Sequence, residues 1–215
     1  MTVTTFFGTT SGGQIESYGA TVYADAYAGA NLEELAAQVF SKIGQYVSGG
    51  NYSCFESFID FDTQSIPDTD TVSAVAMVLE PYADNSATDF LIQIRVRDWG
   101  TSLTTADWVA GADLSALTLV AQLDTDTNWP VGNDRTMINF GTNFVDNINK
   151  TGSTRLILHS ERHSLNTTPT GREDVDYKET ETAGTTSDPY VSVTHAGAGG
   201  GATEPGWFTS RGGWW

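Results

Sequence analysis

The chain is poor in cysteine and histidine. Its 215 residues include one cysteine, Cys54, and three histidines, so no intrachain disulfide can form. We expect Cys54 to be a small buried apolar residue rather than a reactive thiol. His159 and His163 lie four residues apart, but the apolar residues before them indicate a strand, not a helix face that could hold zinc. We therefore expect ordinary surface or partly buried imidazoles, and no cofactor.

Positive charge is also scarce. Ten Lys and Arg residues stand against 27 Asp and Glu residues, which gives a formal net charge of −17 at pH 7. A protein that binds a phosphate backbone needs local positive charge. The composition therefore predicts that nucleic acid is not a partner. An acidic surface of this kind also suits a protein that must not associate at random.

Long hydrophobic runs and catalytic motifs are missing. No window approaches the roughly 20 apolar residues of a membrane-spanning helix. Residues 1–8 (MTVTTFFG) lack the basic region and apolar run of a secretory signal. There is no Gly-x-Ser-x-Gly elbow around a nucleophile. We therefore expect no membrane partner, no secretion signal and no enzyme activity.

The chain does contain many short apolar segments separated by turn residues. Residues 52–62 alternate and read as a strand, and residues 72–80 are apolar on both faces, which predicts a central strand covered twice. In residues 90–97 the alternation places Gln93, Arg95 and Arg97 outward. Two further strands are predicted before residue 25, and others at residues 117–123, 136–140, 155–160, 174–178 and 190–194. These elements predict an all-β fold: an antiparallel β-sandwich of jelly-roll type with one or two short helices.

Residues 31–47 allow two interpretations. Asn31 and Glu34 resemble an N-cap with its acidic partner, whereas residues 39–47 read as a strand that enters a hairpin. We predict a short helix at residues 31–37 followed by that strand. Two other segments are assigned by their turn chemistry: residues 81–89 are predicted to be a polar loop, and residues 104–107 one capped helical turn.

Two segments carry a resemblance to a known family. Residues 58–67 (FIDFDTQSIP) and 72–74 (VSA) resemble the FDTSSIP…VSSA signature of DNRLRE-type jelly-roll domains, and residues 156–160, 173–177 and 188–193 resemble that family's closing strands. The likeness covers about residues 15–195. It implies a jelly roll similar to non-catalytic carbohydrate-binding modules and widespread in phage structural proteins. The chain shows neither the leader nor the catalytic partner domain of the secreted forms, so the virion form is the one expected.

Two sets of loop residues are candidate binding groups. Oxygen ligands of the kind that Ca²⁺ takes are closely spaced in one loop, but without the glycine and final glutamate of an EF-hand, so solvated turn residues are the favoured interpretation: Asp124, Asp126, Asn128 and Asp134. Three loop tryptophans, Trp99, Trp108 and Trp129, are candidate glycan contacts. We favour the alternative that they close the ends of the sandwich.

The last 20 residues differ in composition from the rest. We divide the chain into a β-sandwich domain at 1–195 and a tail at 196–215, whose first part, residues 196–203 (AGAGGGAT), is a flexible linker by composition. Its aromatic side chains cannot stay solvated at low cost. The tail should therefore dock either on its own domain or on a neighbouring subunit, and these side chains are the candidate partner anchors: Trp207, Phe208, Trp214 and Trp215.

The sequence as a whole predicts a non-enzymatic virion structural protein, a capsid decoration or minor capsid protein that is assembled in the host cytoplasm. Its expected partners are the major capsid protein or other virion proteins, and copies of itself. The alternative is a glycan-binding β-sandwich module, either free-standing or as the receptor-contacting part of a tail or capsid. Both rest on fold-level analogy together with the tail and the loop tryptophans.

Overall fold

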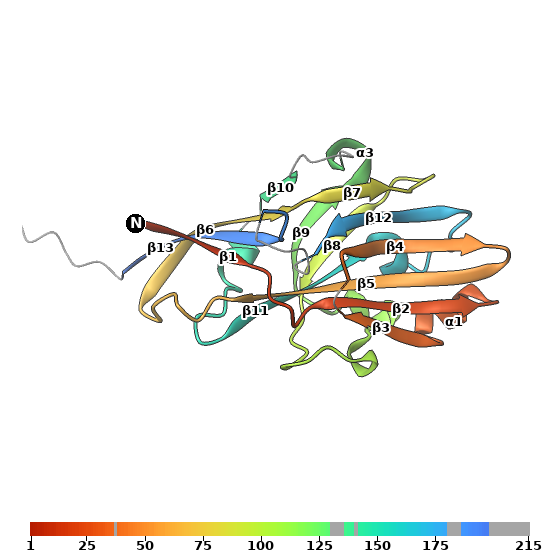
Figure 1. Ribbon diagram of the computed structural model, residues 1–215, viewed down its shortest axis with the longest axis horizontal. Coiled ribbons are helices and arrows are strands. Elements are labelled where there is room, and N and C mark those ends of the chain that lie inside the picture. Colours follow the sequence, from red (N-terminus) through yellow and green to blue (C-terminus); the bar gives the residue numbers. More distant parts are fainter. Residues whose placement is uncertain (37, 130–135, 140–141, 180–185, 198–215) are drawn as a thin grey trace, which may run out of the picture.

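The computed structural model describes residues 1–36, 38–129, 136–139, 142–179 and 186–197. Over these residues the chain is all-β, with antiparallel strands in two curled sheets that lie in a sandwich-like arrangement (Figure 1). This confirms the predicted fold class. Among the described helices, none is long and apolar enough to cross a membrane.

Sheet A contains both the first and the last strand. It has four antiparallel strands in the order β1-β13-β6-β10. Their bounds are β1 Thr2–Phe7, β13 Tyr190–Gly197, β6 Asp70–Leu79 and β10 Thr136–Asn139. The register places Phe6 beside Val191 and Val191 beside Met77, and all three side chains are buried. One face of sheet A therefore packs on the core.

Sheet B is the larger sheet. The segments that resemble the family lie only partly in it. Its main path runs β7-β12-β4-β5-β11-β8-β9, and β2 pairs with both β5 and β3. The bounds are β2 Gly13–Ala20, β3 Leu32–Ala36, β4 Phe40–Ser48, β5 Asn51–Asp62, β7 Pro81–Asp84, β8 Leu91–Val96, β9 Leu119–Asp124, β11 Ser153–Ser160 and β12 Arg172–Lys178.

Sheet B forks at β5. Residues 51–55 of β5 pair with β4 and residues 57–62 pair with β11, while β2 runs along residues 52–58. Beyond the fork, β4 and β12 separate from β11 and β8. The first pair forms one wall of the core and the second pair forms the other. Ile43 and Val175 from one wall and Leu158 from the other are fully buried in that core. The fork therefore makes a sandwich out of a single sheet.

The main hydrophobic core lies between sheet A and the two walls of sheet B. Met77 and Leu79 from β6 meet Phe61 from β5 and Ile94 from β8 in one cluster of buried side chains. A second cluster lies on the opposite side of β5 and β11, where Phe58 and Ile157 pack under the segment that carries Trp99. Because both faces of β5 are covered, its burial is almost continuous.

Several short helices cover the second face of sheet B, and others pack beside the main core. The chain has more of them than the one or two predicted: α1 Tyr23–Ala28, η1 Thr105–Asp107, α2 Gly111–Leu114, α3 Thr125–Asn128, α4 Thr142–Val145 and α5 Glu161–Ser164. The capped turn predicted at residues 104–107 is confirmed, because the Thr104 and Asp107 side chains cap η1 reciprocally. Of the other helices, α1 packs on β2 and β5, and α5 packs on β11, β8 and β4.

Several local predictions were wrong. Residues 32–36 form strand β3 rather than a helix, because pairing with β2 satisfies their backbone groups, while the strand at residues 39–47 is confirmed as β4. The loop predicted at residues 81–89 contains the short strand β7. Strand β6 is not covered twice along its length, since Ala74 is exposed.

Burial of polar residues was also mispredicted. Gln93 and Arg95 lie inside rather than outside, because the segment that includes η1 and α2 covers that face. The Arg95 guanidinium donates to the Leu117 carbonyl at 2.6 Å and to Gln93 Oε1 at 2.8 Å. His159 and His163 are fully buried, not surface or partly buried groups. A segment distant in sequence covers the face that alternation predicts to be exposed to solvent.

Candidate functional site

The calcium candidates do not form a described cluster. Asp124 is occupied as the N-cap of α3, where its carboxylate accepts from the Asp126 amide at 3.0 Å. The side chain of Asn128, and Asp134 as a whole, lie outside the described residues. Within the described part of the chain, no group of three or more His, Cys, Asp or Glu side chains is arranged to hold a metal ion.

The loop tryptophans mostly point inward. Trp99 is 6% exposed and meets Phe58 edge to face at 5.3 Å, and Trp129 is 4% exposed and donates its indole N–H to the Ala83 carbonyl at 3.1 Å. Neither presents an open ring face to a sugar: Trp129 lies in the main core and Trp99 in the second cluster, over Phe58. That they close the ends of the sandwich stays a prediction. Trp108 is half-buried, and a glycan contact there stays a prediction.

A buried acid on β5 and a buried imidazole on α5 lie together. Glu56 and His163 are both fully buried, with Glu56 Oε1 3.9 Å from His163 Nδ1. The Val109 amide donates to Glu56 Oε2 at 3.1 Å, whereas Oε1 has no hydrogen-bond partner among the described residues. Neither His163 nitrogen has one there either, although the Tyr27 backbone lies near.

The charges of this pair follow from its burial. Desolvation raises the pKa of Glu56 well above its usual value and lowers the pKa of His163 to about 4. The His163 imidazole is therefore uncharged at neutral pH, and its contact with Glu56 is not an ion pair. Because the two side chains are sealed from solvent, no substrate can reach them as they stand. The pair is a structural feature that neither the sequence pattern nor the His159–His163 spacing indicated.

A second buried polar network ties α1 and α5 to sheet B. Tyr23 donates to Gln45 Oε1 at 2.7 Å, and Gln45 donates to Glu173 Oε2 at 2.9 Å. Arg162 reaches the same carboxylate with its Nε at 2.7 Å. The Glu173 carboxylate is thus paired and hydrogen-bonded, as a buried charge must be. The network holds the helices in place, and it leaves no group free for chemistry.

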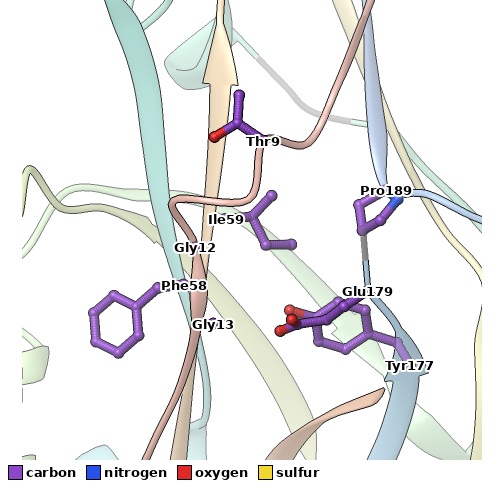
Figure 2. Close-up of a pocket in the computed structure, with 8 residues that line it drawn as sticks. All are labelled: Thr9, Gly12, Gly13, Phe58, Ile59, Tyr177, Glu179 and Pro189. Atoms are coloured by element: carbon purple, nitrogen blue, oxygen red, sulfur yellow. The ribbon is translucent and has the colours of Figure 1, made fainter. Parts of the chain in front are cut away.

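The cavity drawn in Figure 2 lies where the two sheets separate. Thr9 and Gly12 from the β1–β2 connection, Ile59 from β5, and Tyr177 and Glu179 around the end of β12 line it. In the picture, Ile59 points into it while Phe58 points away, and the Glu179 carboxylate lies against the Tyr177 ring. Its volume of about 10 Å³ suits one water molecule rather than a substrate.

Two open hollows flank Tyr46 on the exposed face of β4. Lys42 and Arg172 line one, and Glu16 and Glu33 line the other. The Tyr46 ring is already occupied, because it packs against Phe55 at 5.5 Å and lies under the Arg172 guanidinium at 6.0 Å. The second hollow also contains Tyr18, which is 44% exposed, so one open aromatic ring remains there.

The outer face of sheet A is the distinctive surface of the described chain. The register places the following residues on it: Val3, Thr5, Phe7, Ala74, Ala76, Tyr190, Ser192 and Thr194. None of these described positions is charged, although the chain carries 27 acidic residues. Val3 is 64% exposed and Phe7 is 38% exposed. The register also places Val78 on this face, where it is only 2% exposed. The part of the face that includes Val3, Phe7 and Ala74 is uncharged, partly apolar and exposed, which is typical of a contact surface.

The free edge of sheet A adjoins this face. Among the described strands β1 pairs with β13 alone, so its second edge presents backbone N–H and C=O groups. Edge strands of soluble proteins are usually blunted by lysine, proline or inward charges. The sequence of β1, TVTTFF, contains none of these. The edge is therefore open to pairing with a further strand.

No protein-family model and no curated protein matches the sequence. Function is therefore inferred from the geometry of the chain itself. Sequence reasoning missed the outer face of sheet A, although the signal was present. Every second residue in 74–76 and 190–194 is small or carries a hydroxyl group. An acidic protein would be expected to carry charge at such positions. Recognising them as one surface required the pairing of β1, β13 and β6.

The tail anchors lie outside the described residues. Trp207, Phe208, Trp214 and Trp215 belong to residues 198–215, so their role as partner anchors stays a prediction. The strand before them is longer than predicted, since β13 includes Ala196 and Gly197. The tail consequently starts directly from sheet A.

Proposed function

We propose that the chain is a non-enzymatic structural protein of a virion, a capsid decoration or minor capsid protein that works through protein–protein contacts. The observation that carries this proposal is the uncharged outer face of sheet A in a chain with a net charge of −17. Selection for solubility alone would place charge there as it does elsewhere. A face kept free of charge and next to an open strand edge is suited to burial against another protein.

The composition of the face fits contact with a protein better than contact with a polar ligand. Small side chains such as Ala74, Ala76 and Ser192 let a partner approach the sheet closely, and Val3 and Phe7 add apolar area at about 25 cal/mol per Å² buried. Charged residues are depleted at the centre of protein interfaces. The remaining acidic surface would keep copies of the chain apart except at this face.

The virion setting is supported by the family resemblance of residues 58–67 and 72–74, and by the aromatic tail that follows β13 in the sequence. The partners we propose are the major capsid protein or another virion protein, with copies of the chain arranged around it. Burial of Trp99 and Trp129 weakens the competing glycan-binding function, since only Trp108 retains partial exposure.

Mass spectrometry of virus particles purified from the source culture tests the proposal. The chain is expected among the particle proteins in many copies, and Ala76→Glu is expected to reduce its incorporation about tenfold or more because a charge would be buried at the contact. Ser48→Glu, at an exposed end of β4, is the matched control and should incorporate normally. Particles that lack the chain would refute the virion role, and normal incorporation of Ala76→Glu would refute the use of this face.

A further inference from the structure

Strand β1 directs alternate backbone groups away from its partner β13. In an antiparallel ladder the N–H and C=O of one residue point to the same side, and successive residues alternate. The Gly8 amide donates to the Pro189 carbonyl at 2.8 Å, and β1 pairs with β13 in one unbroken register. Gly8 and every second residue before it therefore face β13. Val3, Thr5 and Phe7 consequently direct their N–H and C=O groups to the opposite edge.

One end of this edge is closed by β5, and the rest is open. Gly8 forms an isolated bridge with Phe61 of β5, so a further strand cannot extend past that point. Before it, Val3 and Thr5 are both exposed. Within the described chain no strand lies beside their outward backbone groups. The open edge is therefore short and is centred between Val3 and Thr5.

Exposed apolar side chains gather on the same segment. Of the eight large hydrophobic residues that are exposed in the described chain, three lie within residues 1–7: Met1, Val3 and Phe7. Their spacing places them, with Thr5, on one face of the strand. Residues 1–7 contain no charged side chain, although the net charge of the chain is −17. Another copy of this acidic chain can therefore approach the segment without meeting a carboxylate on it.

The segment is complementary to itself. When two copies of β1 run antiparallel about a two-fold axis at Thr4, Val3 of each copy lies opposite Thr5 of the other. Their outward N–H and C=O groups then bond across the axis, and both side chains are β-branched, which suits a cross-strand pair. Met1 lies opposite Phe7 on the same face, where a thioether contact with an aromatic ring is favourable. One register thus pairs the open backbone groups and covers the exposed apolar side chains.

We infer that the partner of this edge is a second copy of the chain, paired β1 to β1 so that the two copies of sheet A form one continuous antiparallel sheet. This inference rests on the proposed function, since it specifies how copies of the chain contact one another. A short edge gives a small interface, so the free chain should dimerise weakly, with a Kd on the order of 10–100 μM. Copies held side by side on a particle have a high effective concentration, at which a weak edge contact suffices.

Sedimentation velocity of the full chain over about 1–500 μM tests the pairing, since dimerisation follows mass action. Wild type is expected to pass from monomer to dimer and no further, because a two-fold contact closes on itself. Thr5→Pro removes an N–H that faces the open edge, where a strand tolerates proline. It should weaken dimerisation about tenfold or more, because each copy loses a hydrogen bond across the axis.

The matched control is Thr5→Val, which keeps the N–H and the β-branched shape and should dimerise like wild type. The melting temperature of each variant checks that it is folded. A wild type that stays monomeric over the whole range would overturn the inference. An unweakened dimer in folded Thr5→Pro would overturn it too, because the contact would then lie elsewhere on the chain.

Paired charges test the register. Val3→Lys combined with Thr5→Glu places opposite charges across the axis, whereas Val3→Lys combined with Thr5→Lys places like charges there. The first double variant should dimerise about tenfold more tightly than the second, even though the second has the lower net negative charge. Equal dimerisation of the two would refute the register.

The proposed function fails or stands separately. If the purified chain dimerises through β1 but virus particles lack it, the virion role fails while the edge pairing stands. If particles contain the chain but the purified protein stays monomeric, the edge pairing fails alone.

Discussion

The short helices over sheet B bury several polar side chains. Glu56, His159 and His163 are polar side chains with no exposure to solvent. Desolvation raises the pKa of Glu56 and lowers the pKa of His159 to about 3 and of His163 to about 4. Burial thus favours the neutral form of each group, and each links folding to pH with a sign set by the direction of its shift.

Replacing Glu56 with glutamine is expected to stabilise the fold at pH 7. A carboxyl whose pKa is raised by folding contributes stability below its unfolded pKa near 4.5, which is lost as the pH rises toward the folded pKa. Glutamine avoids that loss and can still accept from the Val109 amide. The gain should be on the order of 1 kcal/mol or more at pH 7 and should vanish by about pH 4.5. Chemical denaturation across that range measures it, and a destabilised Glu56→Gln at pH 7 would contradict the expectation.

His159→Gln is expected to change the acid sensitivity of the fold. The unfolded histidine binds a proton below pH 6.5, whereas the folded one stays neutral down to about pH 3. Its contribution is therefore present above pH 6.5 and lost as the pH falls, by about 1.4 kcal/mol per pH unit. Relative to wild type, the variant should lose less stability between pH 6.5 and pH 4.5 in denaturant titrations. Parallel stability curves for the two proteins would show that His159 does not titrate on unfolding.

At the level of elements, the fork in sheet B decides the architecture. Strand β4 must leave β5 while still pairing with β12, and Gly44 stands at that point with φ of 133°. A Cβ there would lie 2.7 Å from the Asp174 Cα and would collide with the Glu173 carbonyl oxygen. Close approach of two backbones, together with a positive φ, requires glycine at this position.

Gly44→Ala is expected to destabilise the chain by about 3 kcal/mol or more, from backbone strain and overpacking together. The matched control is Gly49→Ala in the β4–β5 turn, where φ is 58° but nothing lies within 4 Å of the added Cβ. That variant should lose only about 1 kcal/mol. Thermal unfolding of both proteins gives the comparison. Equal losses would mean that close approach at the fork does not limit the packing of β4 on β12.

At the scale of the whole molecule, charged residues are distributed unevenly. The chain carries a net charge of −17, yet the outer face of sheet A has no charged side chain among its described positions. Repulsion between carboxylates opposes compaction and association everywhere except at that face. The distribution favours a protein that stays dispersed on its own and associates through one surface.

Raising the ionic strength is expected to raise the melting temperature. At about 0.01 M salt the Debye length is about 30 Å, so most carboxylates repel one another, and at about 0.5 M this repulsion is largely screened. A rise of about 2–4 °C would correspond to about 1 kcal/mol in a chain of this size. Scanning calorimetry in NaCl measures it, and KCl should give the same rise if screening is the cause. A melting temperature that falls with salt would show that attractive pairs, such as Arg162 with Glu173, outweigh the repulsion.

Much of the secondary structure followed from local pattern. Alternation located β8, an apolar run located β11, and the capping pair Thr104 and Asp107 located η1. The helix predicted at residues 31–37 was wrong. Residues 32–36 form a strand instead, because they gain stability by pairing with β2, and local pattern does not reveal that partner. The burial of Arg95 was missed for the same reason, since its cover comes from the segment around α2.

The sequence by itself determined the all-β class, the acidic character, the single buried thiol at Cys54 and the aromatic composition of the tail, because each depends on residue type or on a local period. Tertiary structure alone decided the fork at Gly44, the burial of Glu56 beside His163, and the joining of β1, β6 and β13 into one uncharged face. These features arise from contacts between segments far apart in the chain. Alternation tells which residues share a face, but only strand pairing tells which faces meet.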